Sequence, residues 1–376
     1  MPKDFFNLER FNNYWRNLDK NIFFCFIILF FLGIYFSFSS TSFLAGERLN
    51  KDFYFFFSKH LFFAFFAILL MIFISYLNLP FLRKIIIPLF LFSLILLLLV
   101  PFVGLEVKGS KRWIDLFFFR LQPIEIAKPF FVLFTAEIIS KFYKRDTYYS
   151  YGLSLIILTI ISILLLYQPD IGQTILLIAT WTSIIFVSGI KISFLIIFSI
   201  LLIFISGFLL IILPEKFGYI IQRLKVFYDP TKGDSFQTEK ALAAIKQGGL
   251  KGQGMGEGVL KESVPEAHTD YIIAVITEEY GSIISVLVIC IFLFISYRII
   301  KNCLDTSDNN IRISLCGLSS LLIFQTFIHI GVNTSLLPTT GMTLPFLSYG
   351  GSSLIGSSIL AGVILNYTKK RFDNEK

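Results

Sequence analysis

The chain has 376 residues, of which 55% are hydrophobic and 15% are charged, and its formal net charge at pH 7 is +8. A mean hydropathy of +0.76 excludes an ordinary water-soluble globule, because such a protein would expose much of its apolar surface to water. The positive charge does not indicate nucleic-acid binding, because the basic residues gather in short segments between apolar runs.

A helix that crosses the hydrocarbon core of a bilayer needs about 20 mostly apolar residues. Ten runs of this kind occur, at residues 22–44, 60–79, 85–104, 124–143, 151–167, 172–190, 192–213, 270–297, 312–332 and 346–366. The sequence therefore predicts an all-α polytopic membrane protein with about ten spans. We expect a single membrane domain at 22–366, between an N-terminal segment (1–21) and a tail (367–376).

The distribution of Lys and Arg predicts the orientation, because short cytoplasmic loops carry an excess of both. Basic residues precede the first run, at Lys3, Arg10, Arg16 and Lys20, and others follow the last run. Both termini are therefore predicted to be cytoplasmic. The long segment 214–269, between the seventh and eighth runs, then becomes an outer loop.

Cations are unexpected in an outer loop, yet Lys111, Arg112 and Arg120 lie between the third and fourth runs. Arg is suited to binding phosphate through two parallel hydrogen bonds, and Lys offers a compact point charge. Trp113 is suited to a membrane interface or to stacking on a sugar. The segment therefore indicates an anionic ligand. An interfacial belt whose cations reach lipid phosphates is the alternative interpretation.

Gln122, Glu125 and Lys128 lie at the mouth of the fourth run. Residues three apart share one helix face, so Glu125 and Lys128 are expected to pair. The pair could tie helices together, or Lys128 could line a polar cavity that opens to the outside. Further along, Pro169 precedes Asp170, which we predict to be the N-cap of the sixth span.

The outer loop contains a glycine-rich run at 248–258 that lacks the Lys-Ser/Thr pair of a nucleotide-binding loop, and we expect only flexible backbone near a ligand there. It ends at Asp270. By helical spacing, Asp270, Glu278 and Gly281 would share one face, so carboxylates would run into the membrane along one stripe. Asp270 is the leading candidate for a general base, and a helix cap is the alternative.

Residues 333–351 contain Pro338, Pro345 and several glycines, and so cannot form a plain spanning helix. Irregular backbone at membrane depth is tolerated only where protein or a cavity surrounds it. A polar site is therefore expected near Ser348, Tyr349 and Gly350.

Five motifs in this order resemble the SEDS family, the shape, elongation, division and sporulation proteins, along nearly the whole chain. They are Gly-Ser-Lys-Arg-Trp (109–113), Gln-Pro-x-Glu-x-Ala-Lys (122–128), Gln-Pro-Asp-x-Gly (168–172), Pro-Glu-Ala-His-Thr-Asp (265–270) and Pro-x-x-Gly-x-x-Leu-Pro-Phe-x-Ser-Tyr-Gly-Gly (338–351). The last two resemble the division members of the family more than the elongation members. Two positions depart from the family pattern, which usually has Ser at Ile124 and often Lys at Thr340.

The resemblance implies a ten-helix fold and polymerisation of lipid II, a disaccharide-pentapeptide on undecaprenyl pyrophosphate, at the outer face of the bacterial inner membrane during septal wall synthesis. It implies a class B penicillin-binding protein as partner, among other division proteins of the membrane. The Asp of the His-Thr-Asp motif is essential in the family, which transfers to Asp270. No metal site is predicted, and assistance by Mg²⁺ or Mn²⁺ stays open.

Substrate contacts are expected from residues of these motifs. They are Lys111, Arg112, Trp113, Gln122, Glu125, Lys128, Glu266, His268, Thr269, Ser348, Tyr349 and Gly350. Among these, Lys111, Arg112 and Lys128 would offset the charge of the leaving pyrophosphate. Three alternatives remain: a lipid II flippase, an elongation polymerase and a structural scaffold of the division complex.

Overall fold

The computed structural model describes residues 8–40, 54–107, 110–116, 119–142, 147–212, 214–229, 231 and 235–370. Several predictions fall outside these residues. They are the cytoplasmic placement of Lys3, the ends of three predicted spans (41–44, 143 and 213), Gly109 of the first motif, and residues 371–376 of the tail.

The described residues are mainly helical. The helices are α1 (Leu8–Asn17), α2 (Lys20–Ser40), α4 (Phe55–Tyr76), α5 (Leu79–Val103), α6 (Pro123–Phe142), α7 (Thr147–Tyr167), α8 (Ile171–Val187), α9 (Ile192–Ile212), α10 (Pro214–Tyr228), α11 (Phe236–Gly248), α12 (Ile272–Asp305), α13 (Asn309–Asn333) and α14 (Gly351–Tyr367). The strands β1 (Leu105–Val107), β2 (Ser110–Asp115) and β3 (Arg120–Leu121) form one small sheet, which the sequence analysis did not predict.

Seven of the described helices are long and apolar enough to cross a membrane: α2, α4, α5, α7, α9, α12 and α13. Helices α8 and α14 are apolar but shorter. Helix α6 has 20 residues and carries Glu125 and Lys128 within its first two turns. The prediction of an all-α polytopic membrane protein is therefore confirmed.

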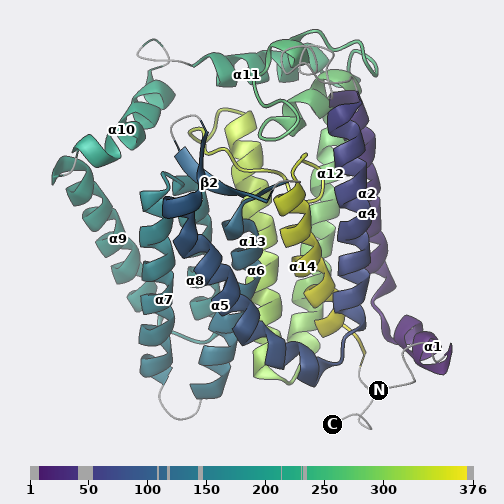
Figure 1. The fold of residues 1–376 in the computed structure, drawn as a ribbon, viewed down its shortest axis with the longest axis vertical. Helices are drawn as coiled ribbons and strands as arrows, with labels where there is room; N and C mark the ends of the chain where they lie inside the picture. Colours follow the sequence, from purple (N-terminus) through teal and green to yellow (C-terminus); the bar gives the residue numbers. More distant parts are fainter. Residues whose placement is uncertain are drawn as a thin grey trace.

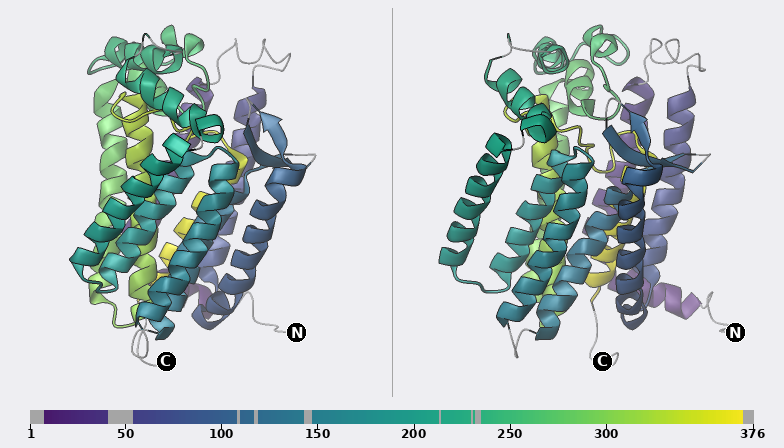
Figure 2. Two further views of the ribbon diagram at one scale, coloured as in Figure 1. Left: turned by 90° about the vertical axis from the view of Figure 1, so that its left-hand side faces the viewer. Right: turned by 60° about the vertical axis from the view of Figure 1, so that its left-hand side comes forward.

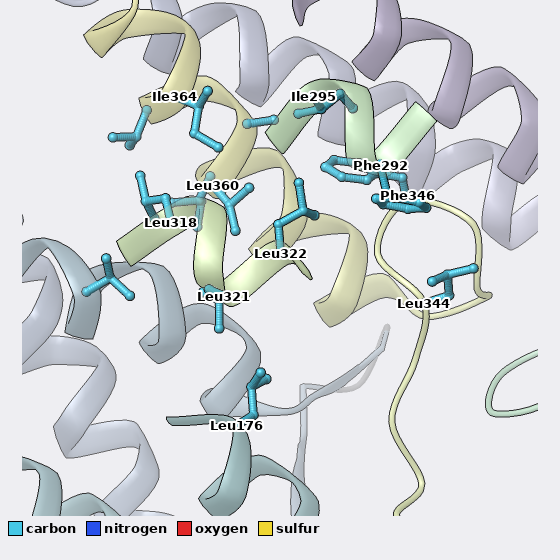
Figure 3. Packing of buried hydrophobic residues seen from close by; sticks show 14 of the residues in the cluster. Leu176, Phe292, Ile295, Leu318, Leu321, Leu322, Leu344, Phe346, Leu360 and Ile364 are labelled. Atoms are coloured by element: carbon cyan, nitrogen blue, oxygen red, sulfur yellow. The ribbon is translucent and has the colours of Figure 1, made fainter. Parts of the chain in front are cut away.

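The long helices lie side by side in one bundle, with α10, α11 and β2 at one end and α1 at the other (Figures 1 and 2). Helix α14 packs between α4 and α6, and α13 packs against α6, α8 and α12. Leu318, Leu322 and Leu360 belong to the apolar core where α13 meets α14 (Figure 3). Helix α9 lies apart at the edge of the bundle, as Figure 2 shows.

The segment 334–350 is irregular, and the last helix begins only at Gly351 rather than at the predicted residue 346. Phe346 is fully buried, and its ring lies 5.2 Å from that of Phe26 and 5.1 Å from that of Phe30 in α2. A Cβ atom on Gly33 would lie 2.3 Å from the Phe346 carbonyl oxygen, so only glycine permits this approach. Protein thus surrounds the irregular backbone, as the absence of water in a bilayer requires.

The predicted stripe of carboxylates along α12 is wrong. Asp270 precedes the helix, and Gly281 interrupts it with a φ of +82°. The hydroxyl oxygens of Thr277 and Ser285 lie 2.8 Å apart, whereas eight residues of a straight helix would separate them by about 12 Å. Glu278 therefore lies beside the loop before α12 and accepts hydrogen bonds from the main-chain N–H groups of Leu260 and Lys261.

The glycine-rich run packs against this turn. A Cβ atom on Gly252 would lie 2.2 Å from the Glu279 carbonyl oxygen, and one on Gly281 would lie 2.2 Å from the Leu250 carbonyl oxygen. These glycines therefore serve close backbone packing, and none of those at 248–258 lines the large cavity described next.

Candidate active site

A cavity of about 830 Å³, here called the large cavity, opens at the end of the bundle that carries α10, α11 and the sheet. Its walls come from the start of α4, the sheet, α10, α11, the loop before α12, the segment 334–350 and the start of α14. Cavities of this size accommodate small-molecule ligands. Segments that are far apart in the sequence therefore build one site.

The sheet directs Arg112 and Lys111 to different surroundings, because successive side chains of a strand point to opposite faces. Arg112 is buried and lines the large cavity, whereas Lys111 is exposed and is not among the lining residues. Arg112 Nε donates to the Gln168 carbonyl oxygen at 3.3 Å, and Nη2 donates to the Pro169 carbonyl oxygen. The guanidinium is thus fixed by the turn before α8.

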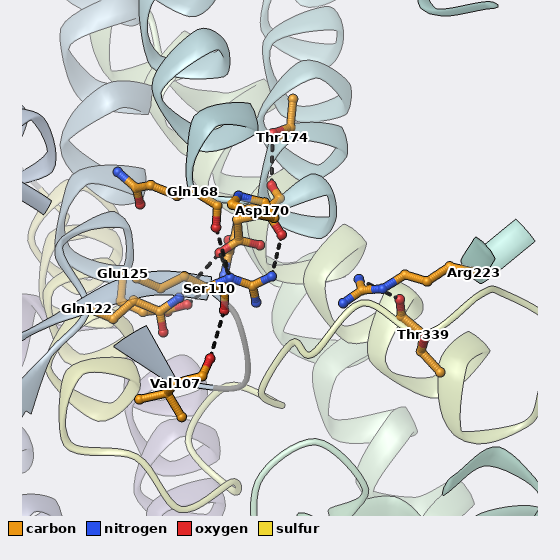
Figure 4. A network of polar contacts seen from close by, with 12 residues as sticks. Val107, Ser110, Gln122, Glu125, Gln168, Asp170, Thr174, Arg223 and Thr339 are labelled. Atoms are coloured by element: carbon orange, nitrogen blue, oxygen red, sulfur yellow. Dashed lines mark hydrogen bonds and ion pairs between the residues drawn. The ribbon is translucent and has the colours of Figure 1, made fainter. Parts of the chain in front are cut away.

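Asp170 occupies the predicted N-cap position of α8. Its carboxylate also contacts the site, because Oδ2 lies 3.8 Å from Arg112 Nε and 3.5 Å from Gln122 Nε2 (Figure 4). Burial raises the pKa of Asp170, and the Arg112 guanidinium opposes that rise. Asp170 therefore helps to position Arg112 and Gln122, a role that the sequence did not reveal.

The loop that carries Asp270 is held through its main chain. Asn333 Nδ2 donates to the Asp270 carbonyl oxygen at 3.0 Å, and Ser348 Oγ donates to the Thr269 carbonyl oxygen at 2.6 Å. The Tyr349 N–H donates to the His268 carbonyl oxygen at 2.9 Å. The end of α13 and the segment 334–350 thus fix the backbone of the Pro-Glu-Ala-His-Thr-Asp motif.

Gly341 lies next to both the Asp270 carboxylate and the Arg112 guanidinium. A Cβ atom built there would lie 3.5 Å from Asp270 Oδ2 and 3.7 Å from Arg112 Nη1. Gly341 has a φ of +70°, which side chains rarely adopt. A carboxylate and a guanidinium therefore approach the same point in the cavity wall, which is the arrangement of a general base beside an anion-binding group.

Comparison with known proteins agrees with the motifs. The family model "Cell cycle protein" (FTSW_RODA_SPOVE) matches residues 19–372. The chain belongs to this family, the SEDS family. A curated relative, the probable peptidoglycan glycosyltransferase FtsW of Caulobacter vibrioides, is 32% identical over 362 residues, which cover 95% of this chain and 91% of the relative.

Two solved structures share the fold of this SEDS protein. One, described as a peptidoglycan synthase complex in which polymerization and crosslinking are coordinated, has a chain that matches with a TM-score of 0.75 and 23% identity, covering 93% of this chain and 97% of that one. The rod shape determining protein RodA of Thermus thermophilus matches with a TM-score of 0.69 and 24% identity, covering 94% and 97%.

Nine residues that the motifs predicted line the large cavity. They are Arg112, Trp113, Gln122, Glu266, His268, Thr269, Asp270, Tyr349 and Gly350. The rings of Phe56, His268 and Tyr349 form one cluster in its wall, with centroids 5.1 to 5.5 Å apart. Aromatic rings of this kind offer a surface for sugars.

Glu125 and Lys128 do not line the large cavity. Their predicted pairing is confirmed, because Lys128 Nζ lies 2.9 Å from Glu125 Oε2. Gln173 Nε2 donates to Glu125 Oε1 at 2.8 Å, and Lys128 Nζ donates to Gln325 Oε1 at 3.0 Å. We call these four side chains the buried network. It joins α6 to α8 and α13, and the space beside it measures only about 10 Å³.

Ser348 is likewise buried, and it binds main chain rather than facing the cavity. Of the two departures from the family pattern, Ile124 is buried in α6. Thr340 packs beside Gly172, where an added Cβ would lie 2.8 Å from the Thr340 Cβ. Neither position lines the large cavity.

Two cations of the large cavity, Lys59 and Arg223, were not predicted, whereas Arg120 was among the outer-loop cations that indicated an anionic ligand. Arg223 of α10 donates from Nη1 to the Thr339 carbonyl oxygen at 3.1 Å (Figure 4). Burial and the nearby Arg112 both lower the pKa of Arg223. The sequence offered no sign of its place, because only the tertiary fold brings α10 to the segment 334–350.

Proposed function

We propose that this chain is a peptidoglycan glycosyltransferase that polymerises lipid II into glycan strands at the outer face of the bacterial inner membrane. The observation that carries the proposal is the convergence of Asp270 and Arg112 beside Gly341 in a cavity of about 830 Å³. The FtsW relatives, which are named as probable peptidoglycan glycosyltransferases, support the reaction type.

In the proposed mechanism, Asp270 is the general base. Its carboxylate takes the proton from a hydroxyl group of the acceptor sugar. The hydroxyl oxygen then attacks the anomeric carbon of the donor, and the bond from that carbon to the pyrophosphate oxygen breaks. A single carboxylate suffices, because pyrophosphate leaves as a stable anion and needs no acid to protonate it.

Arg112 and Arg223 are placed to stabilise the negative charge that develops on the leaving pyrophosphate. Both line the large cavity, and main-chain carbonyl oxygens orient each guanidinium. Fixed charges aimed at developing charge are commonly the largest contribution to catalysis. The exposed Lys111 and the buried Lys128, which the motifs suggested for this task, are replaced in the proposal by Arg223.

The remaining cavity residues of the motifs bind the disaccharide-pentapeptide. Trp113, His268 and Tyr349 offer rings, while Gln122, Glu266, Thr269 and the Gly350 main chain offer hydrogen-bonding groups. Mg²⁺ or Mn²⁺ would bind in the same cavity, because such ions are held by one or two carboxylates together with substrate phosphates. Glu266 would contribute the carboxylate, which leaves Asp270 to act as the base. Substrate phosphates would have to supply the other ligands, because no cluster of three or more His, Cys, Asp or Glu side chains among the described residues could hold an ion.

The topology in this proposal has ten spans, because α6, α8 and α14 complete the seven longer apolar helices. Both termini lie in the cytoplasm, and the large cavity opens outside, where lipid II is consumed. Septal location, a class B penicillin-binding protein as partner and contacts with other division proteins belong to the proposal through the resemblance of the motifs to the division members of the family. The structurally similar chain from a peptidoglycan synthase complex supports a crosslinking partner.

A flippase is the second candidate, and the structure favours the enzyme. A transport path needs polar groups on both sides of the membrane midplane. Here the charged residues at the buried network have about 10 Å³ beside them, whereas the large cavity at one end has about 830 Å³.

The decisive experiment measures glycan-strand formation from labelled lipid II by the purified protein with its cognate penicillin-binding protein. We expect polymer from the wild type and a loss of about 10²- to 10⁴-fold with Asp270→Asn, which is the usual contribution of a general base. Binding of lipid II should persist in the variant. Equal polymer from both would remove Asp270 as the base, and no polymer from the wild type would refute the proposed function.

A further inference from the structure

The cations of the large cavity fall into two groups. Arg112 and Arg223 lie on the side of Thr339 and Gly341, close to Asp270. Lys59 and Arg120 belong to the start of α4 and to β3. In the proposed reaction, Arg112 and Arg223 stabilise the leaving pyrophosphate. Lys59 and Arg120 take no part in that step.

The sheet fixes the spacing between the groups. Arg120 is the β-partner of Asp115, which follows Arg112 by three residues along β2. Three residues of a strand span about 10 Å. The main-chain positions of Arg112 and Arg120 are thus about 10 Å apart along the sheet, so the two guanidinium groups start from separate places in the cavity wall.

The second group has a built environment. The ring of Phe63, one turn after Lys59, lies 5.3 Å from that of Phe119 and packs on Gly351, where an added Cβ would be 2.9 Å from it. Ser352 Oγ donates to the Arg120 carbonyl oxygen at 3.1 Å. Helix α4, β3 and the start of α14 thereby form one end of the cavity.

One carboxylate, Asp115, is the β-partner of Arg120 and also lines the large cavity. Lys59 Nζ lies 4.6 Å above the Phe55 ring, and within the part of the chain that the structure describes neither Lys59 nor Arg120 forms an ion pair. Two cations that form no ion pair with the described residues, at the end of a polar cavity, offer a site for a phosphate-bearing ligand.

The ligand of Lys59 and Arg120 can be inferred from the reaction, an inference that rests on the proposed function. Glycan polymerisation joins two substrates that both carry a lipid pyrophosphate. The donor's pyrophosphate is bonded to the reacting carbon and so lies beside Asp270. The acceptor reacts through a hydroxyl on its far sugar, so its own pyrophosphate lies a disaccharide's length from Asp270.

We propose that Lys59 and Arg120 bind the pyrophosphate of the acceptor substrate, while Arg112 and Arg223 bind that of the donor. The wall between them, with Trp113, Phe56 and Tyr349, accommodates the acceptor disaccharide. The two groups of cations therefore orient the substrates and set the direction of chain growth.

The test separates donor from acceptor. The donor is lipid II whose acceptor hydroxyl is capped, so that it can only give its sugar. One acceptor carries a non-cleavable methylene link between its anomeric carbon and the pyrophosphate-lipid, and a second acceptor carries a methyl group there instead. Coupling rates are measured against acceptor concentration for wild type, Lys59→Met and Arg120→Gln. Lys246→Gln, on the exposed face of α11, is the matched loss of a cation.

We expect each cavity variant to raise the KM for the pyrophosphate acceptor about 10- to 100-fold, as the loss of a charge-assisted hydrogen bond would. The kcat and the donor KM should change less than about twofold. With the methyl acceptor, wild type and variants should have equal kcat/KM, because the group that the cations bind is missing. Lys59→Arg should restore most of the affinity, which separates a binding role from a folding defect.

Three outcomes would overturn the inference. The first is an equal loss with both acceptors, and the second is a rise in the donor KM instead of the acceptor KM. In the third, the effect occurs only in membranes with anionic phospholipids and vanishes in phosphatidylcholine nanodiscs, which would assign Lys59 and Arg120 to lipid headgroups. A wild-type protein that couples no donor to any acceptor would instead refute the proposed function itself.

Discussion

The large cavity and the buried network use similar charged groups in opposite ways. In the network, Glu125 and Lys128 are 4% and 2% exposed and satisfy each other directly at 2.9 Å. In the cavity, Asp270 and Arg112 approach a common point from different elements, with about 830 Å³ of space in front of them. Charge at membrane depth therefore does not by itself distinguish a structural ion pair from a site, whereas the space beside it does.

The largest effect should come from leaving a charge alone in the network. Lys128→Met removes the partner of Glu125, and an unpaired buried charge typically costs about 3 to 5 kcal/mol. We expect a marked fall in the thermal unfolding temperature of the detergent-solubilised protein. Glu125→Gln combined with Lys128→Met should recover much of it, because both charges are then absent. A single variant as stable as the wild type would show that the network is not structural.

Within the cavity, Arg112→Gln should reduce the rate of glycan-strand formation by about 100- to 1,000-fold, which is typical for the loss of a fixed charge-stabilising group. Lys111→Gln, one residue earlier but on the exposed face of the strand, should lose far less. Polymerisation rates of the two variants, measured side by side, show which of the two side chains acts in the cavity. Equal losses would contradict the strand orientation.

Gly341→Ala tests the junction of base and guanidinium. The added Cβ would lie 3.5 Å from Asp270 Oδ2, and the positive φ would cost about 1 to 2 kcal/mol. We expect polymerisation to slow about tenfold. Gly152→Ala in α7, where an added Cβ meets nothing within 4 Å, is the control and should be close to neutral. Equal polymerisation rates of Gly341→Ala and Gly152→Ala would contradict a special role for Gly341 beside Asp270.

The smallest effect is expected where the two regions meet. The Thr343 carbonyl oxygen accepts from Gln325 of the network, and the Thr343 hydroxyl lies 2.7 Å from that of Ser353 in the cavity wall. Thr343→Val removes only the hydroxyl contact, which is worth about 1 kcal/mol. Unfolding should shift slightly and the rate should fall less than with Gly341→Ala. A larger rate loss would mean that the two regions act as one unit.

Most of the fold was predictable, because a bilayer demands long apolar runs that can be recognised locally. Asp270 was singled out by its place at the entrance of a predicted span and by the resemblance of its motif to the SEDS family. The contrast between Lys111 and Arg112 was not predictable, since it depends on a short strand whose alternation decides which side chain enters the cavity. The position of Glu278 was predicted wrongly, because one positive φ at Gly281 changes the direction of the helix and no local pattern in the sequence indicates it.

Arg223 and Lys59 show a second limit. Each reaches the cavity from a helix whose own residues carry no motif, and only packing between distant segments brings them to the large cavity. Sequence analysis could find the groups that share a motif. It could not find cations that long-range contacts bring to the same ligand.

The start of α14 completes the cavity wall with Gly351, Ser352 and Ser353, and the same helix packs between α4 and α6. Helix α14 is synthesised after every other helix and strand described here. The growing polypeptide can thus insert nearly all of its spans while its reaction chamber still lacks one side. The active site is therefore complete only after α14 has joined the bundle. A partly synthesised chain in the membrane has an incomplete cavity and cannot use the substrate.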